Sequence, residues 1–293
     1  MTQDKSWSSR LFDGINIFLL ALIGIITVLP FVHVLAGSFA TVGELSQKQF
    51  VIIPTEFTLD AYRYVFSTDT VIRAMGVSIG VTLIGTIFSM SLNIPMAYGL
   101  SKKDLRGRGL IMFMIVFTML FSGGMIPSFL VVKSLGLIDS YGALIIPSAM
   151  SAFNLIIMRN FFQNLPEGLE ESAKIDGAGS WNILFRIVIP LSMPAIATIS
   201  LFYAVNYWNT YFQAVMYIND ADKWPIQVIL RQIVILAGAL TSDTSGWATE
   251  DVIPPAQTVK MAVIVVATVP ILIVYPFLQK HFAKGALLGS IKG

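Results

Sequence analysis

Six stretches of this sequence contain no Asp, Glu, Lys or Arg, and each is long enough to cross a bilayer as a helix, which takes roughly 20 apolar residues. They are Gly14–Gly43, Ala74–Ser101, Gly109–Val132, Ser140–Met158, Ile187–Asn219 and Met261–Gln279. Charged residues make up only 12% of the chain, about half the share typical of a soluble domain. The sequence therefore predicts an all-α polytopic membrane protein with six transmembrane helices over residues 14–279.

Three details qualify this prediction. A seventh apolar run, Gln232–Ser242, is too short to span and is flanked by polar loops, so we expect a helix outside the membrane. The first stretch is too long for a signal peptide and lacks a small-residue cleavage site, so we expect it to be retained. In the third stretch, Gly123, Gly124 and Pro127 would permit a bend where a gate forms, although Gly and Pro are also common in membrane helices that have no gating role.

The distribution of basic residues predicts the orientation. Six spans put both termini on one side, and Lys and Arg concentrate in cytoplasmic loops. With cytoplasmic termini, the inner segments hold twelve of the nineteen Lys and Arg residues. The densest cluster, KKDLRGR at Lys102–Arg108, fills a short inner loop and is expected to set the topology and anchor at lipid headgroups. We therefore expect a multi-pass protein of the cytoplasmic (inner) membrane, with an inner N-terminal segment 1–13, an inner tail 280–293 and long outer loops 38–73 and 218–260.

Several function classes are disfavoured by composition. The chain has no cysteine, which excludes disulfides and thiolate chemistry. Its two histidines, His33 and His281, lie too far apart in sequence to suggest a metal site, and His33 is best interpreted as a packed or interfacial side chain. A formal net charge of +2 does not suggest nucleic acid as a partner. No G-x-x-x-x-G-K-[ST] phosphate loop is present, so a nucleotide would have to be bound by another chain.

A polar insert over residues 164–190 interrupts the apolar pattern between the fourth and fifth spans. Pro166 suits the first turn of a helix, and Glu167, Glu170 and Glu171 favour the positive end of its dipole. Gly177 can adopt the left-handed conformation that closes a helix. Ser180 offers an N-cap for a second helix over Trp181–Ile189, which Pro190 would end. The insert is thus expected to form two short helices that meet at a corner.

The first of these helices is amphipathic. Leu165, Leu169 and Ala173 recur every four residues on one face, and the acidic residues with Lys174 occupy the other. A small residue at Ala173 would let another backbone approach closely. This pattern predicts a docking surface, whereas a solvated linker would not need two capped helices.

The insert resembles the EAA motif of binding-protein-dependent ABC importer permeases. The resemblance lies in Glu171-Ser172-Ala173, then Asp176-Gly177-Ala178, then Ile187-Val188-Ile189-Pro190, with Ser172 and Ile189 as small departures from the pattern. Residues Pro54–Phe66 resemble an outer loop of maltose-type sugar permeases, and Tyr275–Gly293 resembles the tail of their second permease subunit. Ser122–Pro147 is similar to the branch that imports complex oligosaccharides, including alginate-type and rhamnogalacturonan-type systems.

The resemblance implies a type I ABC importer permease that works by alternating access and is not itself catalytic. The insert would be a coupling element seated in a cytoplasmic ATPase subunit, with Glu170, Glu171, Ala173, Asp176 and Gly177 as its contact residues. This chain would bind no cofactor, because ATP and Mg would be held by the partner ATPase dimer. The other implied partners are a second permease subunit, an extracytoplasmic solute-binding protein, membrane lipid and an oligosaccharide substrate, with alginate or another uronate-containing polymer fragment as one candidate.

A polar stripe in the fifth span is the candidate substrate path. Aromatic rings can stack on sugar faces, and amides and hydroxyls can bond sugar hydroxyls. Tyr and Trp also gather at membrane interfaces, however, and Asn can join helices, so a structural role stays open. The stripe consists of Tyr203, Asn206, Tyr207, Thr210 and Tyr211, and the secondary candidates are Asn209, Gln213, Asn154 and Ser122.

Two other classes of protein remain as alternatives. An ion-coupled secondary transporter of small polar solutes would usually carry acidic groups inside its spans, and none of the six stretches contains Asp or Glu. An intramembrane enzyme would need a Ser–His or paired-Asp arrangement within the spans, and the sequence offers neither. Both are therefore less favoured than the importer permease.

Overall fold

The computed structural model describes the backbone of residues 7–48, 50–67, 69–239 and 257–290. Contacts between residues divide the chain into two compact units. One consists of residues 1–69 and 230–268, and the other of residues 70–229 and 269–293. Helices α14 (Ile226–Ala239) and α15 (Gln257–Ser290) contribute residues to both units.

All the regular secondary structure of the described residues is helical, and these residues form no strand, as the apolar pattern predicts. Three helices are long and apolar enough to cross a membrane alone: α1 (Trp7–Ser38), α4 (Asp69–Ser101) and the first part of α15. Three more candidate spans are bent pairs of helices, which brings the total to six if each pair is one span. The predicted all-α, six-span fold class is therefore confirmed.

The first bent pair joins α5 (Arg108–Leu120) and α6 (Met125–Ser134), which meet at 117°. Gly124 has a φ of 85° at this break, a conformation that L side chains rarely adopt. The bend that Gly123, Gly124 and Pro127 would permit is thus present at these glycines, and a gate at this bend stays a prediction. Leucine, phenylalanine and methionine side chains of α5 are largely exposed, and none of its residues is buried.

The second and third bent pairs build the middle of the second unit. Helix α7 (Gly142–Ile145) runs into a 3-10 turn, η1 (Ile146–Ser148), and then bends by 51° into α8 (Ala152–Gln163). Later, α10 (Ser180–Ile183), the π-helical segment η2 (Leu184–Val188) and α11 (Ile189–Leu191) turn by 85° into α12 (Met193–Trp208). The chain continues through α13 (Phe212–Tyr217) and the 3-10 turn η3 (Ala221–Lys223).

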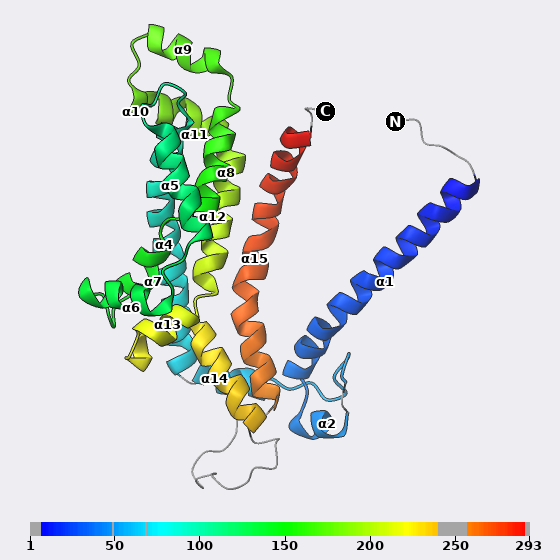
Figure 1. Ribbon diagram of the computed structural model, residues 1–293. Helices are drawn as coiled ribbons and strands as arrows, with labels where there is room; N and C mark the ends of the chain where they lie inside the picture. The colour runs from blue at the N-terminus through cyan, green and yellow to red at the C-terminus, as the bar shows by residue number, and fades with distance from the viewer. Residues whose placement is uncertain (1–6, 49, 68, 240–256, 291–293) are drawn as a thin grey trace. The chain divides into compact units, whose positions relative to one another are not determined.

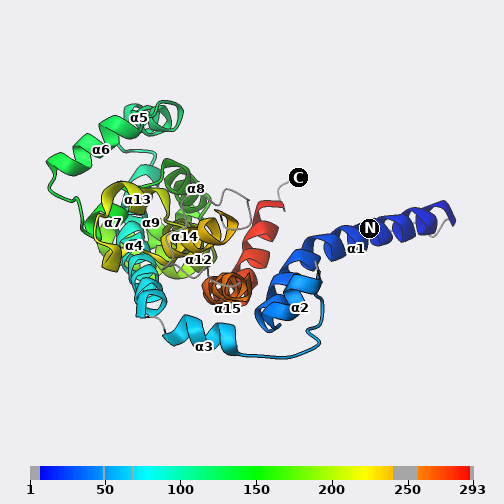
Figure 2. The ribbon, with the colours of Figure 1, turned by 90° about the horizontal axis from the view of Figure 1, so that it is seen from below.

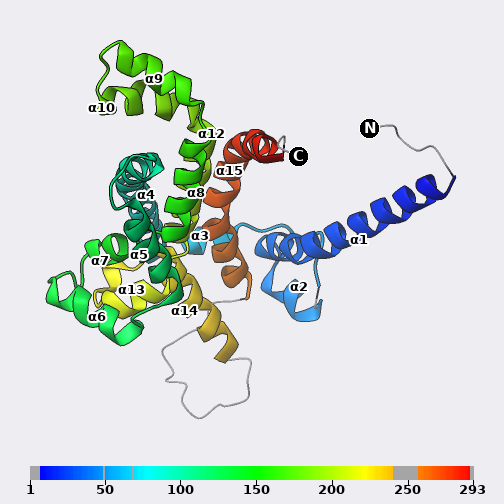
Figure 3. The same ribbon diagram turned by 45° about the horizontal axis from the view of Figure 1, so that its top comes forward.

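The core of the second unit is formed by α4, α8, η2 and α12, whose buried side chains make one cluster. Helix α9 (Glu167–Ile175) and α10 stand at one end of this unit, and α6 and α13 at the other (Figures 1 and 3). Helix α5 lies beside α8 at the edge of the unit (Figure 2). The insert between the fourth and fifth spans is therefore far from the α6–α13 end.

The first unit is organised around the end of α1. Ala36, Ala40, Leu45, Val51 and Met261 form its buried cluster. A Cβ on Gly37 would lie 2.3 Å from the Met261 sulfur, so only glycine allows this approach. The hydroxyl groups of Ser38 and Tyr62 are 2.8 Å apart and tie α1 to α3 (Asp60–Ser67).

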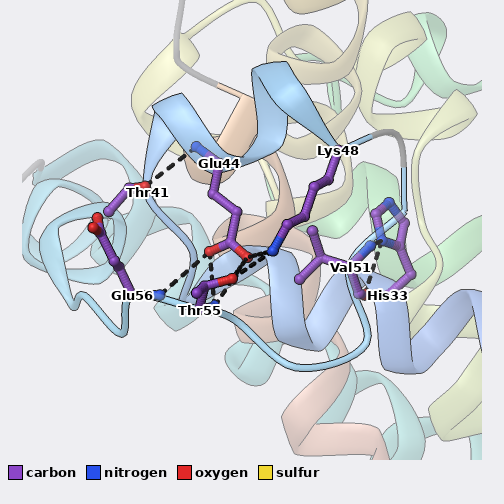
Figure 4. A network of polar contacts seen from close by, with 7 residues as sticks. All are labelled: His33, Thr41, Glu44, Lys48, Val51, Thr55 and Glu56. Atoms are coloured by element: carbon purple, nitrogen blue, oxygen red, sulfur yellow. Dashed lines mark hydrogen bonds and ion pairs between the residues drawn. The ribbon is translucent and has the colours of Figure 1, made fainter.

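A buried carboxylate holds the segment after α2 (Val42–Gln47) in place (Figure 4). Glu44 accepts hydrogen bonds from the Thr55 backbone N–H and hydroxyl, from the Glu56 N–H and from Lys48. The Thr55 hydroxyl, then Lys48, lower the pKa of Glu44 to about 2. His33 packs nearby as expected, stacked on Phe50, with Nδ1 3.0 Å from the Val51 N–H.

Two expectations about the second helix of the insert are wrong. Ser180 is not its N-cap but its first helical residue, preceded by Gly179, and its side chain makes no capping bond. Pro190 does not end the helix, because helical structure continues to Leu191. In an α-helix the proline ring would clash with the carbonyl four residues before it. Here the wider π-helical turn of η2 precedes Pro190, and the bend follows at Ser192 instead.

Candidate functional site

The corner of the insert is a helix stop built around one glycine. Gly177 has a φ of 79°, and its N–H donates to the Lys174 carbonyl at 3.0 Å. The next N–H, of Ala178, donates to the Ala173 carbonyl at 2.9 Å. This pair of bonds is the Schellman arrangement that satisfies the last carbonyls of a helix. The predicted left-handed Gly177 is confirmed, and α9, the corner and α10 are called the hairpin below.

The two adjacent glutamates of the hairpin face different surroundings. Glu170 is partly buried and forms an ion pair with Lys102, whose ammonium also lies 4.0 Å from the centre of the Tyr98 ring. Glu171 is exposed, as is Asp176. One acid therefore ties the hairpin to the loop after α4, and the other is directed to solvent.

The apolar residues of the hairpin and of the residues that flank it are divided in the same way. Leu165, Ala173 and Ala178 pack against the buried core of their own chain. Leu169 is 44% exposed and Ile175 is 86% exposed, and Trp181 and Phe185 are exposed and stacked on one another at 5.9 Å. Only part of the predicted docking face is thus turned outward, because Leu165 and Ala173 fasten the hairpin to the bundle.

A polar cleft of about 420 Å³ opens where η1, the start of α8 and α12 meet. Asn206 is exposed at its wall, and the rings of Phe153 and Phe202 lie 6.4 Å apart beside it. Ser151 caps α8 by accepting the Asn154 N–H at 3.3 Å. The cleft thus combines aromatic faces with amides and hydroxyls, the groups that a sugar site requires. Its full lining is Ser148, Met150, Ser151, Phe153, Asn154, Phe202, Tyr203 and Asn206.

Two tyrosines of the predicted stripe anchor α12 inside the bundle. Tyr203 and Tyr207 are each 1% exposed. The Tyr203 hydroxyl accepts from the Asn93 amide at 3.0 Å and from the Ser151 N–H at 3.1 Å. The Tyr207 hydroxyl donates to the Ile145 carbonyl at 3.1 Å, and its ring fills the space left by Gly85. Both side chains hold α12 against α4 and the break before α8.

The stripe is shorter than predicted, because α12 ends at Trp208. The Asn209 amide donates to the Val205 carbonyl at 2.8 Å, and such local bonds compete with continued helix. Thr210 is buried beyond this end, Tyr211 packs on the core, and Gln213 lies in α13. Ser122 lies in the α5–α6 break, where it accepts the Gly124 N–H. Of the predicted path residues, the cleft brings together Tyr203, Asn206 and Asn154.

Sequence reasoning missed the polar face of α4 that receives α12. Asn93 bonds Tyr203, and Ser89 lies 2.8 Å from the Tyr207 hydroxyl. The signal was present as polar residues at helical spacing within an apolar span. They are Ser78, Thr82, Thr86, Ser89 and Asn93.

At the α6–α13 end, an aspartate joins two loops. Asp139 has a φ of 60°, and its carboxylate accepts from the Asn219 and Asp220 N–H groups and from Lys223. The Asp220 N–H, then Lys223, hold the pKa of Asp139 below its usual value, and Asp139 in turn raises the pKa of Lys223. This end of the unit is therefore closed by internal bonds.

Comparison with known proteins gives consistent results over nearly the whole chain. A family model described as binding-protein-dependent transport system inner membrane component matches residues 82–287. The polygalacturonan/rhamnogalacturonan transport system permease protein YtcP of Bacillus subtilis (strain 168) is 64% identical over 97% of this chain and 99% of that protein. Protein LplC of the same organism is 56% identical over 100% of this chain and 98% of that protein.

A solved structure is also similar. It is the crystal structure of a bacterial ABC transporter involved in the import of the acidic polysaccharide alginate. One of its chains matches with a TM-score of 0.86 and 35% sequence identity, over 96% of this chain and 100% of that chain.

Proposed function

This chain belongs to the family of binding-protein-dependent transport system inner membrane components, and from that premise we propose that it forms half of the translocation path of an ATP-driven oligosaccharide importer. The resemblance seen in the EAA motif is confirmed by the family match. A member of this family is a non-catalytic, multi-pass membrane component. The observation that carries the proposal is similarity along the full length to oligosaccharide permeases.

The hairpin is proposed to couple this chain to a cytoplasmic ATPase dimer, which would bind ATP and Mg. Glu171, Asp176, Leu169 and Ile175 are directed outward and supply charge and apolar area for a partner. Glu170 and Ala173 hold the hairpin to its own bundle through Lys102 and the core. A displacement of α9 would therefore be passed through Lys102 to the end of α4 and through the core to α12, which borders the cleft.

The substrate is proposed to be an oligosaccharide, and the names of the relatives point to a uronate-containing polymer fragment. In the cleft, Phe153 and Phe202 would stack on a sugar ring, and Asn154 and Asn206 would bond its hydroxyls. Tyr203 would shape the floor. A solute-binding protein would deliver the sugar to the outer loops 38–73 and 218–260, and a second permease subunit would complete the path.

This arrangement requires that both termini and the hairpin lie in the cytoplasm, as the distribution of basic residues predicts. ATPase closure would open the path outward, and hydrolysis would reset it inward. Since α9 and the α6–α13 end lie at opposite ends of their unit (Figure 1), α9 can face the ATPase dimer while the α6–α13 end faces the delivered sugar.

The test is transport by the complex that co-purifies with this chain, reconstituted in liposomes with its binding protein. We expect uptake of labelled oligogalacturonide to need ATP. Phe153→Ala should raise the half-saturating sugar concentration about tenfold, because one aromatic contact is lost. Phe113→Ala, at an exposed ring on α5, should leave it unchanged. Uptake that follows an ion gradient without ATP would contradict the importer proposal.

A further inference from the structure

A second cleft, of about 560 Å³, lies at the hairpin end of the second unit, where the loop after α4 meets α8. Its wall includes Arg108, the first residue of α5, and Arg159 of α8, with Lys103 beside them. Leu105 and Met112 form its apolar side. The sequence cluster Lys102–Arg108, which the coupling mechanism uses only at Lys102, thus builds part of a defined cavity. We call it the arginine cleft.

The two guanidinium groups in the arginine cleft are not neutralised by acidic side chains of the described residues. Arg108 donates to the Lys102 carbonyl at 3.5 Å. Arg159 donates to the Leu100 carbonyl at 3.2 Å and to the Asn160 amide oxygen at 3.1 Å. A guanidinium has more N–H donors than these contacts use. Within the described chain neither Arg108 nor Arg159 forms an ion pair, and the cleft lining contains no Asp or Glu.

Both arginines also have a structural role, because Arg159 bonds the Leu100 carbonyl at the end of α4 and Arg108 bonds the Lys102 carbonyl just after it. That role needs donors but not charge, and an amide side chain would supply it. Two partly buried cations sharing one cleft repel each other unless an anion lies between them. The arrangement therefore favours an anion, and paired guanidinium groups match the oxygens of a phosphate group.

The apolar side of the cleft continues along a helix face. Met112, Val116 and Met119 follow Arg108 at helical spacing on α5. Val116 is 41% exposed and Met119 is 49% exposed. A free inorganic ion would gain nothing from this strip, whereas acyl chains would cover it. The cleft thus presents cations at the end of an exposed apolar helix that belongs to a membrane span.

We propose that the arginine cleft binds the phosphate of an anionic phospholipid, with Arg108 and Arg159 as its ligands and the α5 strip as the path of the acyl chains. Basic pockets at the cytoplasmic ends of spans are known to hold such headgroups. The inner location rests on the topology in the proposed function. One bound lipid would brace the short loop between α4 and α5 next to Lys102, which holds the hairpin.

The test is retention of phosphatidylglycerol by the full-length chain, purified in detergent with the subunits that accompany it and measured by native mass spectrometry. We expect one phosphatidylglycerol to be retained in preference to phosphatidylcholine. Arg108→Gln and Arg159→Gln should each weaken retention about tenfold, because each loses a charge-assisted bond. Gly109→Leu should also weaken it, because a Cβ there enters open space in the cleft. Leucine suits a helix better than glycine, so this variant should fold.

Arg106→Gln is the matched control, because it removes the same charge from the same loop but lines a different cleft. It should leave retention unchanged. Equal losses of lipid retention in Arg106→Gln and Arg108→Gln would show that the loop attracts anionic lipid only through its overall charge, which would contradict a defined site. Displacement of the lipid by inorganic phosphate would identify a site for free anions and contradict the assignment to a lipid. Unchanged lipid retention in Arg108→Gln, Arg159→Gln and Gly109→Leu would contradict both the anion site and its assignment to a lipid. None of these outcomes depends on transport, which is assayed separately in liposomes.

Discussion

Two glutamates, Glu44 and Glu171, show how this chain uses the same side chain for opposite purposes. Glu44 lies in the first unit and accepts bonds from Thr55, Glu56 and Lys48 of its own chain (Figure 4). Glu171 lies on the hairpin of the second unit and is exposed, with exposed Leu169 and Ile175 on the same short helix. A carboxylate enclosed by internal donors maintains local structure. A carboxylate that is exposed beside exposed apolar residues is available to a partner.

The largest expected effect on transport comes from changing Glu171, the exposed glutamate of the pair. Glu171→Lys should reduce ATP-driven uptake roughly 100-fold, as expected for reversing one partner of an interface ion pair. Membrane insertion and thermal stability should be unchanged, because the Glu171 side chain is exposed. Uptake and ATPase turnover are measured on the same reconstituted complex. The charge reversal Asp13→Lys on exposed α1 is the control, and full transport by Glu171→Lys would refute the coupling role.

A charge swap sharpens the contrast between the two hairpin glutamates. Glu170→Lys should lower uptake about tenfold by repelling Lys102, and Lys102→Glu in the same chain should restore most of it. The same second change should not rescue Glu171→Lys, whose proposed partner lies on another subunit. The two single glutamate variants and the two double variants with Lys102→Glu are compared by initial uptake rate. Rescue of both glutamates, or of neither, would show that they are not divided between internal and external partners.

The corner residue gives a smaller effect through backbone strain alone. Gly177→Ala should cost about 1–2 kcal/mol at the corner, because alanine is strained at a φ of 79°, and uptake should fall several-fold. Gly179→Ala is the matched control, since a Cβ at either position meets no atom within 4 Å and Gly179 has a φ of −71°. Equal activity of both variants would mean that the hairpin tolerates a distorted corner.

The smallest effect on transport is expected at the enclosed glutamate. Glu44→Ala should lower the melting temperature by roughly 5 °C, whereas Glu56→Ala, which removes an exposed carboxylate of the same segment, should not. The pKa of Glu44 is lowered to about 2 from 4.5, so its contribution is complete above pH 4.5 and is lost as the pH falls towards 2. Melting is followed by tryptophan fluorescence, and an unchanged pH profile in Glu44→Ala would contradict this assignment.

The sequence predicted the parts of this fold that depend on local patterns. Charge-free stretches identified the spans, Gly177 identified the corner, and the glycines before Pro127 marked a position that would permit the bend between α5 and α6. Each depends on hydrophobic length or on φ, which a few adjacent residues determine. The EAA motif added the family, since its spacing covers some twenty positions.

The remainder depends on contacts between distant residues. The stripe on α12 was visible, but whether Tyr203 faces a sugar or the bundle depends on Asn93, which lies 110 positions away. The same is true of Glu170, whose partner Lys102 is 68 positions away. The prediction that Pro190 ends its helix was wrong because the π-helical turn before it removes the clash between the proline ring and the carbonyl four residues earlier, which would occur in an α-helix. The different roles of two adjacent glutamates cannot be predicted from the sequence, because each role depends on which distant residue the side chain contacts.

The central claim is that the hairpin contacts a cytoplasmic ATPase, and cross-linking tests it most directly. The chain has no cysteine, so Glu171→Cys places a single thiol on α9 and Glu56→Cys places one on the first unit. A short bifunctional reagent is applied to the purified, transport-active complex. The account predicts capture of an ATPase subunit from position 171 and none from position 56. Capture from position 56, or none from position 171 in an active complex, would contradict it.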